Sequence, residues 1–427
     1  MDPNVFRLMA QCPPGLEPLL VSELKGLGIR ATALQGGASW TGGWSDLMAA
    51  NLHLRVASRV LVELGTFGAR ALGELERKGG ALPWDRVPRA APARFRVSSS
   101  RSRLYHEGAI EERLRNAGDL PAPAESAGIG DVVGARGDAD LDAGDGTPDA
   151  GGPLVVVRVH RDKVTVRLDT SGEHLHRRGY RLHVGVAPLR ETLASALLLA
   201  GPMSDSPSAA PPPVVDPFCG SGTVAIEAAL LARRIAPGLA LADRTPRHFA
   251  FRDWPDFPQA AWELEVEAAR ADILPELPGR TAIFGSDRDA GVLEAAAANA
   301  ERAGVLEDLH LATATLSKAP GPEELASAGV PPGWLVTNPP YGGRLGDRRR
   351  LRALYTSLGR AFGPGGRFAA GWSLLYFSGD PVLDAATGLP LEERFATSHG
   401  GLRVRAVAME GAGEDSGEDS GEEPREA

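Results

Sequence analysis

The sequence predicts an α/β protein in two parts, an α+β front half and a back half built on a doubly wound, largely parallel sheet. Three observations predict this fold class. The chain has 427 residues, enough for two or three domains. Before residue 188, strand-like and helix-like segments are mixed and include a hairpin signature. After it, strands alternate with helices, which is typical of a parallel sheet covered on both faces.

In the front half, the spacing of apolar residues and the positions of turn residues define the elements. Arg161-Asp162 separates two alternating segments and predicts a hairpin turn. We expect strands at 5–10, 31–35, 38–42, 94–98, 154–160 and 163–169, and helices at 15–24, 45–63 and 107–115.

In the back half, we expect a helix at 189–200, a strand, glycine turn and helix at 214–235, a strand and helix at 282–303, and a strand at 334–337. Residues 236–280 contain many prolines and two tryptophans and interrupt this alternation, so we interpret them as an insertion.

The composition excludes several classes of protein. Hydrophobic residues make up 43% and charged residues 24%, as in soluble globular proteins. Cys12 and Cys219 are too few for a disulfide framework or a structural zinc site, so we expect no metal. No segment approaches the roughly 20 apolar residues of a membrane span. The N-terminus also lacks a signal peptide's charge order. We therefore expect a cytoplasmic monomer that does not contact membranes.

The formal net charge of −9 conceals an uneven distribution. Residues 118–152 and 410–427 each carry a net −7, have little apolar content, and are predicted to be a disordered loop and a disordered tail. Residues 1–117 and 153–190 each carry +5, whereas residues 191–409 carry −5. The front half is therefore basic, which suits binding to nucleic-acid phosphates.

The segment Asp216-Pro-Phe-Cys-Gly-Ser-Gly-Thr223 joins a strand to a helix through two glycines. Such a turn allows a ligand to approach the backbone at the helix N-terminus. It also fits a dinucleotide fingerprint, and a purely structural turn is a third interpretation. Asp287 ends the next strand, where it could bind the two ribose hydroxyls of an adenosine-type cofactor or cap the helix that starts at Ala290. Acids at both strand ends favour a ligand that carries a cation.

The segment Thr337-Asn-Pro-Pro-Tyr-Gly342 directly follows an apolar strand. Pro339 and Pro340 fix the backbone and leave carbonyl groups without ladder partners. Asn338 adds a second acceptor and Tyr341 an aromatic face. Two acceptors and a ring suit a planar base with an exocyclic NH2 group. A simple proline turn is the less specific alternative.

A basic cluster lies in and after the predicted hairpin, and its arginines surround Tyr180. We considered an RNA phosphate clamp and, for the stretch 178–181, docking between the two domains, and the residues leave these two open. The candidate RNA-binding residues are Arg158, Arg161, Lys163, Arg177, Arg178 and Arg181.

The motifs DPFCGSGT, GSDRD and TNPPYG, in this order, resemble those of class I S-adenosylmethionine-dependent methyltransferases that act on exocyclic amines. The segments CPPGLEPLLVSEL, LHLRVASRVLVEL, LDTSGEHLHRRGYR and APLRETLASALL resemble a bacterial family that joins ferredoxin-like and THUMP RNA-binding regions to such a domain. This family includes guanine-N2 methyltransferases of 23S ribosomal RNA. The resemblance covers nearly the whole chain except the acidic loop and tail.

The resemblance implies a ferredoxin-like subdomain at 1–65, a THUMP domain at 66–172 that contains the acidic loop, a Rossmann-like methyltransferase domain at 185–409, and the tail from residue 410. It also implies site residues. The methionine part of the cofactor would be surrounded by Asp216, Phe218, Gly220, Ser221, Gly222 and Thr223. Asp287 would hold the ribose and Arg288 would lie near the adenine. The target amine and base would be positioned by Asn338, Pro339, Pro340 and Tyr341, and the segment 190–192 would flank the cofactor.

Two departures from the family pattern concern the site. The chain has only hydroxyl side chains around Thr313, where the family usually has an acid for the adenine amine, and Gly343 stands where the family has a glutamate. We expect an RNA methyltransferase that uses S-adenosylmethionine to modify guanine N2, with 23S ribosomal RNA the favoured substrate. The alternatives are a tRNA guanine, another exocyclic or side-chain amine, and a non-catalytic RNA-binding or ribosome-assembly factor with a degenerate methyltransferase domain.

Overall fold

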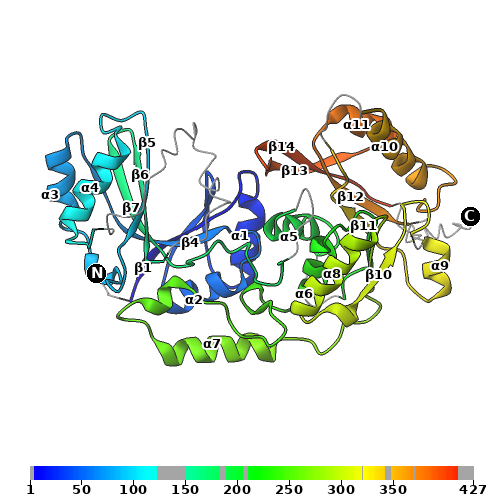
Figure 1. Cartoon of the computed structure of the whole chain (residues 1–427), viewed down its shortest axis with the longest axis horizontal. Coiled ribbons are helices and arrows are strands. Elements are labelled where there is room, and N and C mark those ends of the chain that lie inside the picture. Colours follow the sequence, from blue (N-terminus) through cyan, green and yellow to red (C-terminus); the bar gives the residue numbers. More distant parts are fainter. Residues whose placement is uncertain are drawn as a thin grey trace, which may run out of the picture.

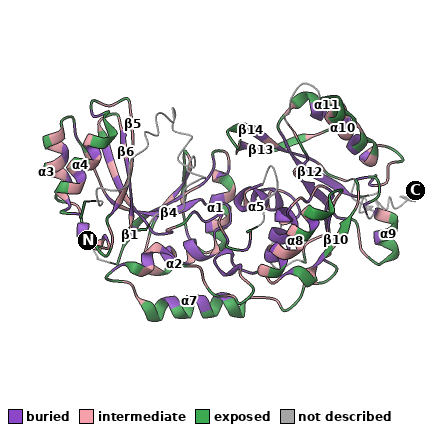
Figure 2. Ribbon diagram, viewed as in Figure 1, coloured by how far each residue is buried: buried purple, intermediate pink, exposed green. Residues whose placement is uncertain are grey.

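The computed structural model describes residues 4–122, 151–182, 189–204, 210–319, 321–341, 348–369 and 371–411. Most of the predicted acidic loop, nearly all of the tail, and Gly343 lie outside these residues. Figure 1 shows two sheet-containing halves side by side, with the first half in blue to cyan and the second in green to red. Figure 2 shows the buried residues concentrated between the sheets and the helices that cover them.

The first half contains a seven-stranded sheet in the order β2-β3-β1-β4-β7-β6-β5. Its strands are β1 (Phe6–Gln11), β2 (Thr32–Leu34), β3 (Gly37–Gly42), β4 (Arg59–Gly68), β5 (Arg94–Ser100), β6 (Leu154–His160) and β7 (Lys163–Asp169). Its helices are α1 (Glu17–Gly26), α2 (Trp44–His53), α3 (Leu72–Gly79) and α4 (Glu107–Ala117). β4 pairs with both β1 and β7, so this single sheet continues across the domain boundary predicted at residue 65.

The predicted hairpin is confirmed, because β6 and β7 pair in antiparallel register around Arg161 and Asp162. Both turn residues have positive φ angles, 49° and 61°. The predicted helix 45–63 is wrong in its second part, because α2 ends at His53 and residues from Arg59 form strand β4. This strand lies inside the sheet, and the side chains of residues 60–62 are buried on both faces. A strand buried on both faces has a continuous apolar run, whose pattern fits a helix equally well.

The second half contains a sheet in the order β10-β9-β8-β11-β12-β14-β13. Its strands are β8 (Val214–Asp216), β9 (Ile283–Asp287), β10 (Leu309–Thr313), β11 (Trp334–Thr337), β12 (Ser373–Ser378), β13 (Glu392–His399) and β14 (Leu402–Met409). Its helices are α5 (Glu191–Leu199), α6 (Thr223–Ala232), α7 (Gln259–Ala271), α8 (Ala290–Arg302), α9 (Pro322–Ser327), α10 (Arg348–Phe362) and α11 (Pro381–Thr387).

The five strands from β10 to β12 are parallel, and β14 runs antiparallel to both of its neighbours. The predicted doubly wound sheet is confirmed. The strand order reverses at β8, which lies between β9 and β11. Ligands of doubly wound sheets bind beyond the carboxyl ends of the strands at such a reversal.

The insertion at 236–280 connects the two halves through aromatic side chains. The Trp254 ring lies 5.7 Å from that of Trp44 in α2 and 6.4 Å from that of Phe6 in β1, both edge-on. Trp262 of α7 packs edge-on against Phe251. Edge-to-face aromatic pairs add to the stabilisation from apolar burial. The insertion therefore joins the second half to the first.

None of the helices in the described ranges is long and apolar enough to cross a membrane. In the same ranges, no three His, Cys, Asp or Glu side chains lie close enough together to hold a metal ion.

Candidate functional site

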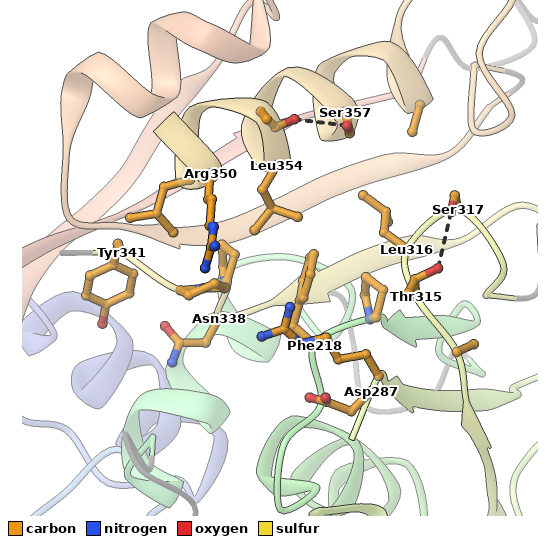
Figure 3. Close-up of a pocket in the computed structure, with 18 of the residues that line it drawn as sticks. Phe218, Asp287, Thr315, Leu316, Ser317, Asn338, Tyr341, Arg350, Leu354 and Ser357 are labelled. Carbon is orange, nitrogen blue, oxygen red and sulfur yellow. Dashed lines mark hydrogen bonds between the residues drawn. The ribbon is translucent and has the colours of Figure 1, made fainter. Parts of the chain in front are cut away.

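A pocket of about 1490 Å³ lies at the carboxyl ends of β8, β9 and β11, where the strand order reverses. α10 forms the opposite wall (Figure 3). Seven of the predicted catalytic and cofactor-binding residues line this pocket: Phe218, Asp287, Arg288, Asn338, Pro339, Pro340 and Tyr341. Arg181 and Arg190 line it too. The structure therefore brings together three motifs that are far apart in the sequence.

The glycine turn lies next to the pocket rather than in its wall. Gly220 and Gly222 have φ angles of 52° and 86°, which favour glycine because a Cβ is strained there. Gly222 precedes the first residue of α6, so the helix N-terminus faces this turn. The Gly220 amide donates a hydrogen bond to Asp287 Oδ2 at 3.2 Å, which ties the turn to the pocket wall. Ser221 and Thr223 are buried.

Asp287 does not cap the following helix. The cap of α8 is Asp289, whose Oδ1 accepts a hydrogen bond from the Gly291 amide at 2.9 Å. The Asp287 carboxylate instead accepts from the Gly220 and Asp289 amides and lines the pocket. Of the two roles that the sequence left open, the capping role is wrong and the ligand-binding role stays a prediction.

Asp216 is buried beneath the pocket and does not line it. Its Oδ1 accepts hydrogen bonds from Thr337 Oγ1 at 2.6 Å and from the Phe218 amide at 3.2 Å. Burial raises its pKa to about 7. Since Thr337 directly precedes Asn338, Asp216 fixes the end of β11 relative to the glycine turn.

Asn338 holds an unpaired acceptor at the pocket. Its Oδ1 is buried and has no hydrogen-bond partner among the described residues. A buried acceptor without a partner is costly, so such an atom indicates a donor that arrives with a ligand. The adjoining prolines line the same wall. The geometry is that of a site that receives an N–H group.

Tyr341 is half-buried next to Asn338, and its hydroxyl lies 2.7 Å from His399 Nδ1. Burial raises the pKa of Tyr341 to about 12, so the phenol stays protonated near neutrality. Sequence reasoning missed His399, because it lies at the end of β13, 58 residues further along the chain. Only the fold shows this contact.

The sequence also did not identify α10 as a pocket wall. Arg350, Leu354 and Ser357 of this helix line the pocket opposite Asn338 (Figure 3), and Arg360 lines the pocket too. Thr315 and Ser317, whose hydroxyl oxygens are 3.2 Å apart, line it near the expected adenine position. As expected from the sequence, this part of the wall carries hydroxyls and no acid.

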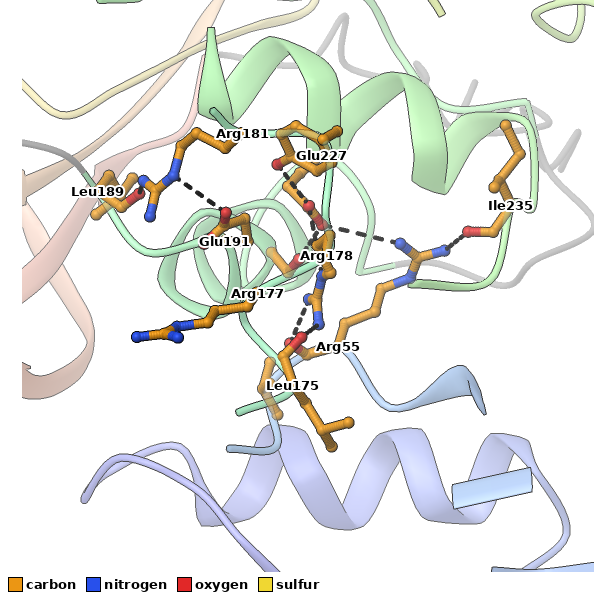
Figure 4. Close-up of polar contacts among 12 residues, drawn as sticks. Arg55, Leu175, Arg177, Arg178, Arg181, Leu189, Glu191, Glu227 and Ile235 are labelled. Atoms are coloured by element: carbon orange, nitrogen blue, oxygen red, sulfur yellow. Dashed lines mark hydrogen bonds and ion pairs between the residues drawn. The ribbon is translucent and has the colours of Figure 1, made fainter. Parts of the chain in front are cut away.

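A buried polar cluster joins the two halves of the molecule, and we call Arg55, Arg178, Arg181, Glu191 and Glu227 the junction cluster (Figure 4). The Arg178 guanidinium donates to the Leu175 and Arg55 carbonyl oxygens at 2.6 and 2.7 Å and lies 3.6 Å from Glu227 Oε1. Its exposed fraction is 2%. This burial favours the docking interpretation for Arg178 over RNA contact.

The other candidate RNA-binding residues are placed differently. Arg181 pairs with Glu191 at 3.1 Å and also lines the pocket. Arg177 points away from the junction cluster (Figure 4). Arg161 and Lys163 are exposed at the hairpin turn, and Arg158 is half-buried on β6. Their contacts with RNA stay predictions.

Two family models match the chain in the expected order. Residues 7–61 match a model described as the RlmL ferredoxin-like domain, and residues 178–403 match one described as RMKL-like, methyltransferase domain. The chain is 33% identical over 412 residues to the ribosomal RNA large subunit methyltransferase K/L of Syntrophotalea carbinolica, covering 94% of this chain and 53% of that protein. The chain spans about half the length of the curated relatives it matches.

Solved structures resemble the whole described fold. SMU.472, described as a methyltransferase complexed with SAH, superposes with a TM-score of 0.77 at 27% identity, covering 96% of this chain and 99% of that one. A protein from Listeria monocytogenes, described as a predicted N6-adenine-specific DNA methylase, superposes with a TM-score of 0.74 at 29% identity, covering 94% and 96%.

These matches confirm the ferredoxin-like region and the class I methyltransferase fold that the motifs implied. The methyltransferase model alone covers more than half of the chain. This protein therefore belongs to the RMKL-like methyltransferase-domain family.

Proposed function

We propose that this chain transfers a methyl group from S-adenosylmethionine to the exocyclic N2 amine of a guanine in large-subunit ribosomal RNA. The observation that carries the proposal is the buried, unpaired Asn338 Oδ1 in the pocket at the end of β11. This atom can accept a hydrogen from an exocyclic amine. The name of the curated relative supports ribosomal RNA as the substrate.

The pocket fits the proposed cofactor. In the described chain, the Asp287 carboxylate accepts hydrogen bonds from only two backbone amides. Its remaining lone pairs can accept hydrogen bonds from ribose hydroxyls. Phe218 and Arg288 also line the cavity and could contact the remainder of the cofactor. When bound, S-adenosylmethionine would supply the methyl group: its S–CH3 bond breaks and the sulfonium sulfur leaves as a neutral thioether.

The residues of this chain would make the amine reactive. The lone pair of guanine N2 is delocalised into the ring, so the nitrogen is a poor nucleophile while it stays planar. Asn338 Oδ1 and the Pro339 carbonyl would each accept one of its hydrogens and favour tetrahedral geometry. These hydrogen bonds strengthen as positive charge develops on the nitrogen, which stabilises the transition state. No strong base is needed before transfer, because the nitrogen releases its extra proton only after the N–CH3 bond has formed.

The remaining contribution is alignment of the reacting atoms. Tyr341, held by His399, would present its ring to the target base. A base that is paired in a helix cannot reach this site, so the target nucleotide must be unpaired or flipped out of its stack. Asp216 would act as a positioning residue through Thr337.

Two other functions stay as alternatives. The first is methylation of adenine N6. The Listeria protein described as an adenine methylase has the same overall fold, and the N6 amine of adenine carries two hydrogens, as the N2 amine of guanine does. The hydroxyl-only wall around Thr315 favours the second alternative, a non-catalytic RNA-binding or assembly factor with weak cofactor binding. The basic first half favours RNA over a protein substrate.

Nucleoside mass spectrometry of RNA from a deletion strain tests the substrate. We expect N2-methylguanosine to decrease in 23S ribosomal RNA and to be unchanged in tRNA. An unchanged content in both would refute the guanine proposal, and a decrease in N6-methyladenosine would favour the adenine alternative. Calorimetry tests the non-catalytic alternative, which predicts no S-adenosylmethionine binding at millimolar concentrations.

Asn338→Ala tests the mechanism. We expect kcat to fall about 10²–10³-fold, as when one transition-state hydrogen bond is removed, with cofactor affinity unchanged. Asn116→Ala, an exposed position on α4 in the first half, is the matched control and should leave both quantities unchanged. Loss of cofactor binding together with activity in Asn338→Ala would show that Asn338 is structural.

A further inference from the structure

α10 is a strongly basic helix placed across the pocket from Asn338. Its sequence, RRRLRALYTSLGRAF, contains five arginines and no acid. Arg350 and Arg360 line the pocket, and Figure 3 shows the Arg350 side chain extending from α10 toward the side of the cavity that holds Asn338. We propose that the face of α10 that carries Arg350 and Arg360 binds the sugar-phosphate backbone of the RNA strand on either side of the target nucleotide. This inference rests on the proposed RNA substrate.

The charges of the pocket wall support this inference. Six arginines line the pocket, and Asp287 is the single acid among the described lining residues. Arg181 and Arg367 are engaged by Glu191 and by the carbonyl oxygen of Ala319, respectively. The side chains of Arg350 and Arg360 are exposed and make no hydrogen bond or ion pair with any residue in the described ranges. Cations without counterions, next to a concave site, attract phosphate groups.

The spacing of the two arginines suits a strand that passes along the helix. Ten residues separate Arg350 from Arg360, which is roughly 15 Å along an α-helix. This separation allows contact with phosphates of different nucleotides. Between them, Leu351 and Leu354 present half-buried apolar side chains to the cavity, where a ribose or a base could pack.

The size of the cavity also leaves room for more than a cofactor. Its volume of about 1490 Å³ exceeds the roughly 300–1,000 Å³ of an ordinary small-molecule site. The positive charge of this wall contrasts with the rest of the second half, because residues 191–409 carry a net charge of −5. An exposed face that is merely solvated would be expected to mix both signs of charge. α10 instead concentrates positive charge beside the candidate target site.

The experiment uses the full chain and a fluorescein-labelled 20-nucleotide single-stranded RNA that contains guanine. Arg350→Glu, Arg360→Glu and the double variant are compared with wild type by fluorescence anisotropy between 50 and 200 mM NaCl. Arg280→Glu is the matched control. It reverses an exposed charge in the same half, just before β9, and therefore at the opposite edge of the sheet from the pocket. Calorimetry with S-adenosylhomocysteine checks that each variant keeps its cofactor site.

We expect the double variant to bind RNA about tenfold or more weakly at 100 mM NaCl, and each single variant to show a smaller loss. The slope of log affinity against log salt should decrease by about 1.4, the value for two lost phosphate contacts on a single strand. Arg280→Glu should match wild type. RNA affinity and salt slope that are unchanged in the double variant would overturn the inference, as would a loss equally large in Arg280→Glu.

A methyl-transfer assay on the same proteins separates this inference from the proposed function. Weakened RNA binding by the α10 variants supports the inference even if wild type transfers no methyl group, in which case the proposed function alone fails. Methyl transfer by wild type, together with wild-type RNA binding by the double variant, overturns the inference and leaves the proposed function standing.

Discussion

The arginines of the junction cluster and those of α10 are the same residue type in opposite surroundings. In the junction cluster, Arg55 donates to the Ile235 carbonyl at 2.6 Å and Arg178 is buried beside Glu227. On α10, Arg350 and Arg360 are exposed and unpaired within the described chain. The comparison shows that an arginine's partners in space, rather than a run of basic residues in the sequence, decide whether it holds the fold together or stays exposed at the pocket.

Glu227 explains the difference on the junction side. Its two carboxylate oxygens accept hydrogen bonds from Tyr180 and Ser195 at 2.8 and 2.7 Å, and two arginines lie within 4.0 Å. Burial also lowers the pKa of Arg55 to about 10, which still leaves it charged at neutral pH. Buried charges of this kind are stable only when each is paired. The arginines of the junction cluster therefore have a structural role, which is to join the two halves.

The largest expected effect is that of Arg178→Ala. It removes the donor to the Leu175 and Arg55 carbonyls and the nearer of the two arginines beside the buried Glu227. Losing one partner of a buried ion pair costs about 3–5 kcal/mol of unfolding free energy. Urea denaturation measures this loss. Arg177→Ala, the neighbour that points away from the cluster, is the control and should change stability by less than about 0.5 kcal/mol. Equal effects at Arg178 and at the half-buried Arg177 would show that membership of the junction cluster makes no difference to stability.

An intermediate, pH-dependent effect is expected for Glu191→Gln. Burial raises the pKa of Glu191 from 4.5 to about 7. Because the folded state then holds this proton more tightly than the unfolded state, the carboxyl's contribution to stability is full below pH 4.5 and is lost as the pH rises toward 7. We expect the Tm of Glu191→Gln to rise relative to wild type across this window. Parallel Tm curves for the two proteins would contradict the raised pKa.

The smallest expected effect on stability is that of Arg350→Glu, which should change the unfolding free energy by less than about 0.5 kcal/mol because the side chain is exposed and has no partner in the described chain. The same urea titration measures it beside Arg178→Ala. If α10 contributed to the fold through its arginines, the two variants would lose similar stability, and the contrast between the two groups would fail.

Much of the fold was predictable because its signals are local. The hairpin at Arg161-Asp162 and the strand before Asn338 follow from turn residues and short apolar runs. The prediction of helix across residues 54–63 was wrong, because a strand buried on both faces lacks the alternation of polar and apolar residues that identifies strands. α3 was not anticipated at all.

The candidate site was predictable in its motifs but not in its full wall. Asp287 and Asn338 were identified from segments next to strand ends, where parallel strands gather polar groups, and Phe218 from the resemblance of its motif to the methyltransferase family. His399 was missed because nothing near it in the sequence marks a ligand. The α10 arginines were missed although residues 348–352 form a basic run, because only the fold places that run beside the pocket. The structure shows Asp216 buried and hydrogen-bonded to Thr337, and its expected contact with the cofactor stays a prediction.

The sequence by itself determined the order of the elements, the glycine turn, the Asn-Pro-Pro-Tyr motif and the separation of charge along the chain, since each depends on neighbouring residues and on local backbone preferences. Only the tertiary structure decided which arginines are neutralised and which face the pocket. The reason is physical: Tyr180 meets Glu227 across 47 residues and Thr337 meets Asp216 across 121, and no local pattern encodes contacts made across such distances.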